Sequence, residues 1–193
     1  MNLPLQVYSK QNFNNLSCPG QELIDKEFSN CIFKKCDFSE SNFSNTSFID
    51  CEFVNCNLSN IKVKNCNFQG VTFEGCKLLG TRFSTIDSFL VTWEFKKCGI
   101  TLCDFGDLEI KASKFLDCDL KEVDFINTDL TGSDFSGSSL LQCKFYHTNL
   151  EKTNFVGAVD YYINPVDNKL KGAQFSYPNV LGLLDCFGVK VEF

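Results

Sequence analysis

The chain has 193 residues, of which 44% are hydrophobic, and a formal net charge of −6. This length suits one domain or one continuous repeat array, and the negative charge disfavours direct binding to nucleic acid or to an anionic membrane. No apolar run reaches the eighteen or so residues that span a membrane, and the first residues lack a secretory signal, so we expect a soluble, cytoplasmic protein.

Residues 1–22 lie before the first regular pattern, and we expect them to form an N-terminal cap. From Leu23 onward a large apolar residue, which we call a centre, recurs at every fifth position. An α-helix would spread such residues around its surface, and a straight strand would send successive ones to opposite faces. The spacing therefore indicates a backbone that bends at regular intervals. The centres of this first run are Leu23, Phe28, Phe33, Phe38, Phe43, Phe48, Phe53, Leu58, Val63, Phe68, Phe73, Leu78 and Phe83.

The regular spacing breaks once, over residues 84–94. Twelve residues separate Phe83 from Phe95, where ten would keep the spacing. Trp93 falls two residues before a centre, a place that elsewhere holds small residues, so we expect a local distortion here. One interpretation is a tolerated packing defect. The other is a projecting contact loop, with Phe89 and Trp93 as its anchors.

Beyond the break the spacing resumes and continues to Phe155 without a miss. The position two residues before a centre, which we call the slot, is mostly small or β-branched, and ten of the twelve cysteines occupy it. The remaining positions are mostly polar. The centres of this second run are Phe95, Ile100, Phe105, Ile110, Phe115, Leu120, Phe125, Leu130, Phe135, Leu140, Phe145, Leu150 and Phe155.

The repeat over residues 23–158 resembles that of the pentapeptide-repeat family, because roughly 25 centres obey one rule. The resemblance implies an all-β fold, a right-handed quadrilateral β-helix in which each repeat forms one side and four sides close one coil. Stacked coils would pair like parallel strands about 4.8 Å apart, with every centre pointing at the axis. The buried stack of Phe and Leu side chains would then be the main stabilising contribution.

The cysteines have a structural interpretation in this fold. Cys36, Cys56 and Cys76 would form one interior column, and a thiol is a small, polarizable filler that suits a slot also occupied by Ser, Thr and Val. Zinc binding is the alternative, because Cys31 and Cys36 have C-x4-C spacing. That spacing only restates the repeat period, so we expect reduced, metal-free thiols and no cofactor.

Acidic residues are concentrated in one part of the chain. Residues 1–100 carry ten acidic and ten basic side chains, whereas residues 101–140 carry nine acids against Lys111, Lys114 and Lys121. In the implied fold this segment is two coils, so its charge density is about 0.6 per Å, close to that of B-DNA at one per roughly 1.7 Å. Asp also suits the turn before a centre, which explains each residue but not their clustering. The nine acids are Asp104, Asp107, Glu109, Asp117, Asp119, Glu122, Asp124, Asp129 and Asp134.

Residues 159–193 depart from the repeat, and we expect them to close the stack. Ser176 and Pro178 suit the start of a helix, Gly188 suits its C-terminal cap, and the apolar residues between them have helical spacing. We expect a short amphipathic α-helix and an apolar tail that cap the last coil and also form a two-fold homodimer interface. The interface residues would be Val180, Leu183, Leu184, Phe187, Val189, Val191 and Phe193.

The end of the chain narrows the resemblance. Residues 171–193 are similar to the C-terminal segment of the Qnr-type quinolone-resistance proteins and of the microcin-immunity pentapeptide protein, and residues 163–170 are similar to the connector of the immunity type. The implied function is mimicry of duplex DNA on the DNA-binding surface of DNA gyrase or topoisomerase IV, which blunts quinolones or peptide poisons. The Qnr-type proteins carry longer projecting loops than the break in this chain.

An enzyme is not expected. His147 is the only histidine and falls at an outward position, so no Ser-His-Asp or Cys-His pairing can be built on it. The resemblance implies that the nine acids of residues 101–140 contact the topoisomerase. The alternative from another class is a cytoplasmic β-helical scaffold or regulatory interaction module with an unrelated protein partner.

Overall fold

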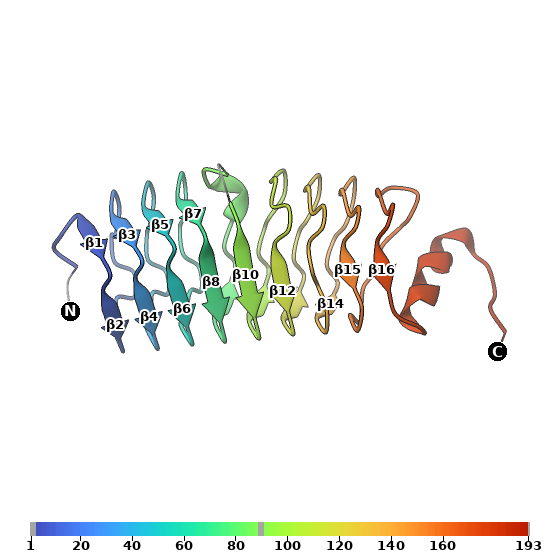
Figure 1. Ribbon diagram of the computed structural model, residues 1–193, viewed down its shortest axis with the longest axis horizontal. Helices are drawn as coiled ribbons and strands as arrows, with labels where there is room; N and C mark the ends of the chain where they lie inside the picture. The colour runs from blue at the N-terminus through green and yellow to red at the C-terminus, as the bar shows by residue number, and fades with distance from the viewer. Residues whose placement is uncertain (1–2, 89–90, 193) are drawn as a thin grey trace.

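The structure is a computed structural model that describes residues 3–88 and 91–192. The chain forms a right-handed quadrilateral β-helix of about eight turns, and its coils follow one another along a rod with the two termini at opposite ends (Figure 1). The fold expected from the repeat is therefore confirmed.

Short parallel strands line three sides of the rod. The first side carries β1 (Val7–Ser9), β3 (Glu27–Ser29), β5 (Ser47–Ile49) and β7 (Asn67–Gln69). The second side carries β2 (Asn12–Asn14), β4 (Ile32–Lys34), β6 (Glu52–Val54), β8 (Val71–Glu74), β10 (Trp93–Lys96) and β12 (Lys114–Leu116), followed by β15 (Asn154–Phe155) and β16 (Gln174–Phe175). The third side carries β9 (Lys77–Leu79), β11 (Gly99–Thr101), β13 (Asp119–Lys121) and β14 (Ser139–Leu141). In the described ranges the fourth side is joined by isolated bridges, such as the one between Asp104 and Asp124.

The register shows where the repeat slips. Phe28 pairs with Phe48 across 20 residues, whereas Phe73 pairs with Phe95 across 22. The bridge between Asn67 and Asp87 still spans 20 residues. The two extra residues therefore lie between Asp87 and Trp93, and every side chain beyond them returns to the expected side.

The centres fill the interior. Those from Phe28 to Phe155 are all buried, as predicted. Their rings stack along the axis in nearly parallel pairs. In one such pair the ring centroids of Phe33 and Phe53 are 4.7 Å apart and their ring planes make an angle of 11°. Around each coil neighbouring rings meet edge to face, so both favourable aromatic geometries recur throughout the rod.

The slot residues connect successive coils. The Thr46 hydroxyl donates to the Leu23 carbonyl at 2.7 Å, and the Cys66 thiol reaches the Phe43 carbonyl at 2.7 Å. Each bond joins a slot to the preceding coil across 23 residues. A small side chain with one donor satisfies this geometry, which explains why Cys, Ser and Thr alternate there. Ten slot cysteines are buried and free of disulfides in the described chain, and Cys18 is buried at a centre position instead.

At the corner that ends most sides of a coil, one residue adopts the left-handed backbone conformation. The residue two positions after a centre has positive φ, for example 59° at Asn45 and 60° at Asp107. This conformation costs little only for Gly and is best tolerated by Asn and Asp among the other residues. The abundance of these three residues therefore follows from the corners of the fold.

The regular coils extend beyond both ends of the segment 23–158. Tyr8 in β1 stacks on Phe28 with centroids 5.0 Å apart, so residues expected to form only an N-terminal cap already belong to a coil. At the other end Phe175 stacks on Phe155 at 5.0 Å. Before Leu23, the residues Leu3, Tyr8, Phe13 and Cys18 keep the spacing of five, so the sequence already carried this extension, whereas the residues after Ala158 depart from that spacing.

The helix after the last coil is present, but its winding differs from the expected α-helix. Residues Asn179–Phe187 form the 3₁₀ helix η2, and Gly188 ends it in the left-handed conformation at φ 62°, as predicted for the cap. Ser176 does not cap the helix through its side chain, because its hydroxyl accepts the Gly157 N–H at 3.0 Å. Gly182 within the segment weakens α-helical propensity, which favours the tighter winding.

Candidate partner-binding surfaces

The nine acids of residues 101–140 do not share one face. The structure distributes them around the rod according to their position in the coil. The fourth side and its following corner hold Asp104, Asp107 and Asp124; the first side holds Glu109 and Asp129; the second side and its corner hold Asp117 and Asp134; the third side and its corner hold Asp119 and Glu122.

Four of these acids also shape the backbone. The side chain of Asp104 accepts the Gly106 N–H at 2.9 Å, and that of Asp124 accepts the Ile126 N–H at 2.8 Å. Asp129 and Asp134 make the same bond two residues ahead. Asn42 does so too, in a coil of the neutral half. The turn therefore needs an oxygen acceptor but not a charge, so the charge of these aspartates is free to serve another role.

Lysines neutralise part of the acidic surface. Lys111 lies 3.2 Å from Glu109 and 3.3 Å from Asp129, and its hydrogen bond to Glu109 raises its pKa. Burial opposes ionisation of Asp129, but hydrogen bonds from Thr131 and Lys111 outweigh it and lower the pKa of that carboxyl. The first side therefore carries less free negative charge than its acids suggest.

The acids of the fourth side keep their charge. Asp104, Asp107 and Asp124, which we call the fourth-side acidic patch, make no ion pair within the described chain. Asp104 and Asp124 are register partners on successive coils, and Asp107 lies at the corner, where its carboxylate accepts the Asn127 amide at 3.1 Å. These three carboxylates on two coils form a surface that attracts cations, and Arg82 and Lys144 flank Asp104 and Asp124 in the register.

The proposed loop anchors are not supported. Trp93 is only 3% exposed, and its indole packs edge to face against Phe83, Phe95 and Phe105. The slot that normally holds a thiol here holds an indole, and the two added residues let the backbone accommodate it inside the core. Phe89 lies outside the described residues. The contact role predicted for Trp93 is therefore wrong, because its ring cannot reach a partner.

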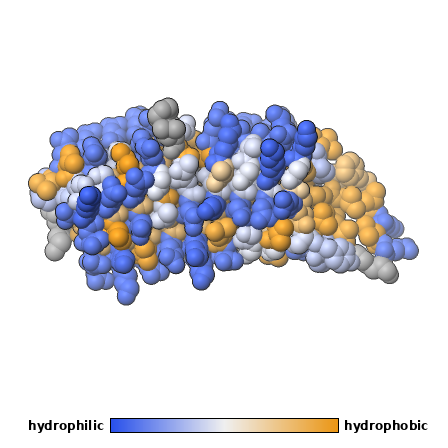
Figure 2. Space-filling model, viewed as in Figure 1, coloured by the Kyte–Doolittle hydropathy of each residue, from blue (hydrophilic) through white to orange (hydrophobic). Residues whose placement is uncertain are grey.

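The C-terminal end exposes apolar side chains, and Figure 2 shows hydrophobic residues gathered there. Four residues of the predicted interface have exposed side chains: Leu184 (37% exposed), Phe187 (56%), Val189 (53%) and Val191 (41%). Leu183 packs against the core and so helps to hold the helix to the rod, and Val180 is half-buried. Phe193 lies outside the described residues. The exposed four residues form the C-terminal apolar patch.

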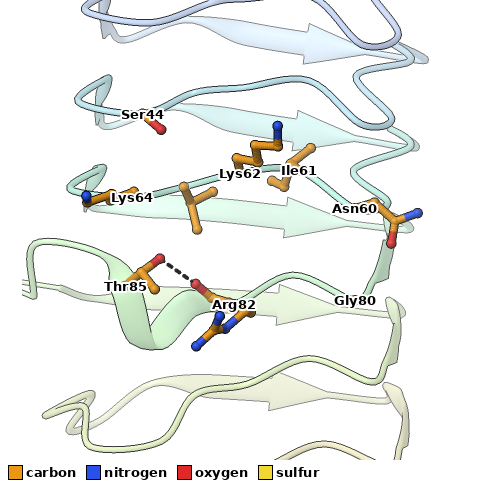
Figure 3. Close-up of a pocket in the computed structure, with 9 residues that line it drawn as sticks. Ser44, Asn60, Ile61, Lys62, Lys64, Gly80, Arg82 and Thr85 are labelled. Atoms are coloured by element: carbon orange, nitrogen blue, oxygen red, sulfur yellow. Dashed lines mark hydrogen bonds between the residues drawn. The ribbon is translucent and has the colours of Figure 1, made fainter.

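A hollow on the fourth side was missed by the sequence reasoning. It has a volume of about 350 Å³, and its lining includes Ile61, Val63 and the cations Lys62, Lys64 and Arg82 (Figure 3). The signal was present, since Lys62 and Arg82 are 20 residues apart and so return to the same side. It lies one coil before the fourth-side acidic patch, because Arg82 bridges Asp104.

Two classes of site find no support in the described chain. No group of three or more His, Cys, Asp or Glu side chains there could hold a metal ion. None of the helices described has the length and apolar character that crossing a bilayer requires. The surfaces that remain are suited to contacts with other molecules.

Comparison with known proteins supports the same architecture. A family model described as "Pentapeptide repeat region" matches residues 26–91 and 88–155. Two trypsin-treated structures of QnrB1, a plasmid-mediated fluoroquinolone resistance protein, are similar in fold. One has a TM-score of 0.66 at 14% identity, covering 96% of this chain and 100% of that one. The other has a TM-score of 0.65 at 16% sequence identity, and the match covers 97% of this chain and 99% of that one.

A further solved structure is that of HetL, a pentapeptide repeat protein involved in heterocyst differentiation regulation from the cyanobacterium Nostoc sp. strain PCC 7120. It has a TM-score of 0.42 at 14% identity, covering 88% of this chain and 87% of that one. No curated protein sequence matches the chain. At these identities the likeness to the QnrB1 structures concerns the fold alone.

Proposed function

Because the chain belongs to the pentapeptide-repeat family, we propose that it is a non-enzymatic protein that takes the place of duplex DNA on a bacterial type II topoisomerase. The partner is DNA gyrase or topoisomerase IV in the cytoplasm, and occupation of its DNA-binding surface reduces the action of quinolones or of peptide gyrase poisons. The observation that carries the proposal is the fourth-side acidic patch, whose three carboxylates form no ion pair with any residue that the structure describes. The proposed action against quinolones is prompted by the fold likeness to QnrB1, a plasmid-mediated fluoroquinolone resistance protein.

The geometry of the patch suits a surface that binds phosphates. Asp104 and Asp124 are register partners, so their carboxylates repeat at about the 4.8 Å strand spacing, comparable with the roughly 3.4 Å between phosphates along one DNA strand. Aspartates on the other sides add to the field of the rod. A basic groove that tracks a phosphate backbone would therefore meet a similar row of negative charge.

We also propose that the protein acts as a homodimer through the C-terminal apolar patch. Four exposed apolar side chains follow one another on η2 and the tail, and a self-complementary patch under two-fold symmetry is the commonest route to a dimer. In such a dimer the two acidic segments lie on either side of the centre of a longer rod. This doubles the length of surface offered to a two-fold symmetric topoisomerase.

The experiment that tests the function is a gyrase supercoiling assay titrated with this protein at low salt, with and without a fluoroquinolone. We expect inhibition of supercoiling that is relieved by added DNA, and less drug-induced cleavage when protein and drug are present together. If supercoiling is indifferent to a large molar excess of the protein, mimicry is wrong. The scaffold with an unrelated protein partner then takes its place.

A further inference from the structure

The hollow on the fourth side opens where the hydrogen-bonded ladder between two coils is interrupted. In the preceding coil the Phe43 N–H donates to the Lys62 carbonyl at 2.8 Å, and the Lys62 N–H donates to the Ser41 carbonyl at 2.9 Å. One coil further the equivalent donors are the N–H groups of Val63 and Arg82. Neither has a hydrogen-bond partner in the part of the chain that the structure describes. By the register of the fold, both N–H groups point along the axis into the gap between their coils.

The interruption has two local causes. The first cause is the short 3₁₀ helix η1, Phe83–Thr85. The carbonyl of Arg82, just before this helix, accepts a hydrogen bond from the Thr85 hydroxyl at 2.8 Å (Figure 3), so this carbonyl is turned away from the Val63 N–H. Val63 also stands in the column between Phe43 and Phe83, where a smaller side chain fills less of the space between coils. A tightened turn beside a small centre leaves the hollow.

The hollow carries positive charge without a counterion. Lys62, Lys64 and Arg82 line it and are all exposed, and none makes an ion pair among the residues described. Figure 3 shows the two lysines leaving one coil and Arg82 leaving the next, with their charged ends spread apart. Because these side chains are long and unpaired, rotation about their own bonds is enough to bring them toward a bound anion.

We propose that this hollow is a binding site for a small anionic molecule that carries a phosphate or carboxylate group. The oxyanion accepts hydrogen bonds from the N–H groups of Val63 and Arg82, as anions do in concavities lined by backbone N–H groups. Lys62, Lys64 and Arg82 supply the charge, while Ile61 and Val63 are almost completely buried and form only the apolar floor of the hollow. The volume of about 350 Å³ lies at the lower end of the range of roughly 300–1,000 Å³ for small-molecule sites.

The test is an NMR titration of the ¹⁵N-labelled full chain with inorganic phosphate, adenosine monophosphate and benzoate, each balanced with chloride to constant ionic strength. We expect saturable shifts centred on the amides of Val63 and Arg82, with dissociation constants on the order of millimolar. Tightest binding of adenosine monophosphate assigns a phosphomonoester, and tightest binding of benzoate assigns a carboxylate. Shifts that never saturate, or that spread over lysines all around the rod, overturn the proposal.

Two variants locate the site. Lys62→Gln with Arg82→Gln is expected to weaken binding by about tenfold or more, whereas Lys144→Gln is the matched control. Lys144 is also exposed and also precedes a centre of the fourth side, but its ladder is intact, with its N–H on the Val123 carbonyl at 2.9 Å. Equal binding by the double variant and the control overturns the site.

A further variant tests whether binding requires the open space of the hollow. Val63→Phe gives this position the residue of its column neighbours Phe43 and Phe83, so the fold is expected to persist with an unchanged circular dichroism spectrum. The ring closes the space between the coils, and the saturable shifts are expected to disappear. Binding that survives in a folded Val63→Phe protein contradicts the proposal, and if this variant does not fold the charge variants decide.

Discussion

Asp104 lies directly over Asp124, its register partner on the next coil, and this pair is flanked in the register by Arg82 and Lys144, neither of which forms an ion pair with it in the described chain. Both also close their own turns through a backbone N–H. Charge and turn geometry can be separated experimentally, because Asn42 closes the same turn in the neutral half without a charge.

The first prediction concerns stability. Asp124→Asn keeps the acceptor for the Ile126 N–H and removes a charge whose register partners are the like charge of Asp104 and the opposite charge of Lys144, so the two effects offset each other and the free energy of unfolding is expected to change by less than about 0.5 kcal/mol at low salt. Urea denaturation at low and at about 1 M salt measures this, and the change should be small at both. Asp37→Asn is the control, since Asp37 has uncharged register partners, Ser17 and Asn57. A loss of stability in Asp124→Asn alone would mean that the turn requires the carboxylate.

The second prediction concerns the partner. Replacing Asp104, Asp107, Asp124 and Asp129 together by Asn is expected to weaken topoisomerase binding by roughly tenfold or more and to flatten its salt dependence. The cause is the loss of charge on two neighbouring sides while the turns are kept. Affinity measured between about 50 and 200 mM salt tests this. The matched control, Asp37→Asn with Glu40→Gln in the neutral half, should bind like the unmodified protein, and equal loss in both variants contradicts a localised contact.

The third prediction concerns the core. Phe115 is fully buried and stacks between Phe95 at 5.0 Å and Phe135 at 4.8 Å, so Phe115→Ala is expected to cost about 3–5 kcal/mol. A rod tied by hydrogen bonds on both sides of the cavity cannot collapse into it. Thermal or urea unfolding provides the measurement. Leu141→Ala on the exposed face should cost less than about 0.5 kcal/mol, and a similarly small cost at Phe115 would argue against a packed stack.

The fourth prediction concerns alkaline pH. Burial raises the pKa of Cys51, Cys66 and Cys143 to about 12. Exposed thiols in the unfolded chain ionise near their ordinary value of about 9, so the stabilisation is complete below pH 9 and is lost as the pH rises toward 12. Urea midpoints should therefore fall steeply above pH 9, and the native thiols should react slowly with alkylating reagents.

A single substitution tests that cause. Cys66→Thr keeps a donor for the Phe43 carbonyl, as Thr46 does one coil earlier for Leu23, but removes one titrating group. Between pH 9 and 10 this variant should lose about 1 kcal/mol less than the unmodified protein. Identical pH profiles would show that other groups, such as lysines, govern the alkaline transition. Stoichiometric zinc in the purified protein would overturn the assignment of the thiols to the core.

The fifth prediction concerns assembly. Leu184→Asp with Phe187→Asp places charges in the C-terminal apolar patch, so it is expected to convert a dimer to a monomer at micromolar concentration. Light scattering measures the mass. Leu102→Asp is the control, because Leu102 is 54% exposed at a corner remote from the patch. If the unmodified protein is already monomeric, the dimer is wrong and η2 only caps the last coil.

The repeat could be predicted because one physical constraint recurs many times. A ring such as Phe33 is needed wherever the backbone turns its centre inward, so spacing alone identifies the regular bends and the slip of two residues before Phe95, while the four-sided coil followed from the resemblance to the pentapeptide-repeat family. The extension to Tyr8 was missed although Leu3, Tyr8 and Phe13 keep the same spacing, because Cys18 interrupts the run of large centres before Leu23.

The site was less predictable than the fold. Counting acids along the chain shows which two coils are acidic, but not on which side of the rod each acid lies. The side decides whether an acid has a cation partner. Glu109 and Asp129 both form ion pairs with Lys111, whereas Asp104 and Asp124 form none among the described residues. The burial of Trp93 depends on how two added residues relax the backbone, which spacing does not describe. The hollow was only partly predictable: the small centre Val63 and the 20-residue spacing of Lys62 and Arg82 are visible in the sequence, whereas the two hydrogen bonds missing between the described coils are not.

The register of the coils makes the rod a molecular ruler. In the regular coils on either side of the break register partners are 20 residues apart, and only near the end does Phe145 pair with Ile163 across 18 among the described residues; removing 20 residues, for example 104–123, would therefore shorten the rod by one spacing of about 4.8 Å and leave every later side chain on its original side. Removing a single repeat would instead rotate everything beyond it by a quarter turn. Distance along the rod and direction around it are therefore independent coordinates. Evolution can move a charged side chain relative to the C-terminal end without redesigning the scaffold that carries it.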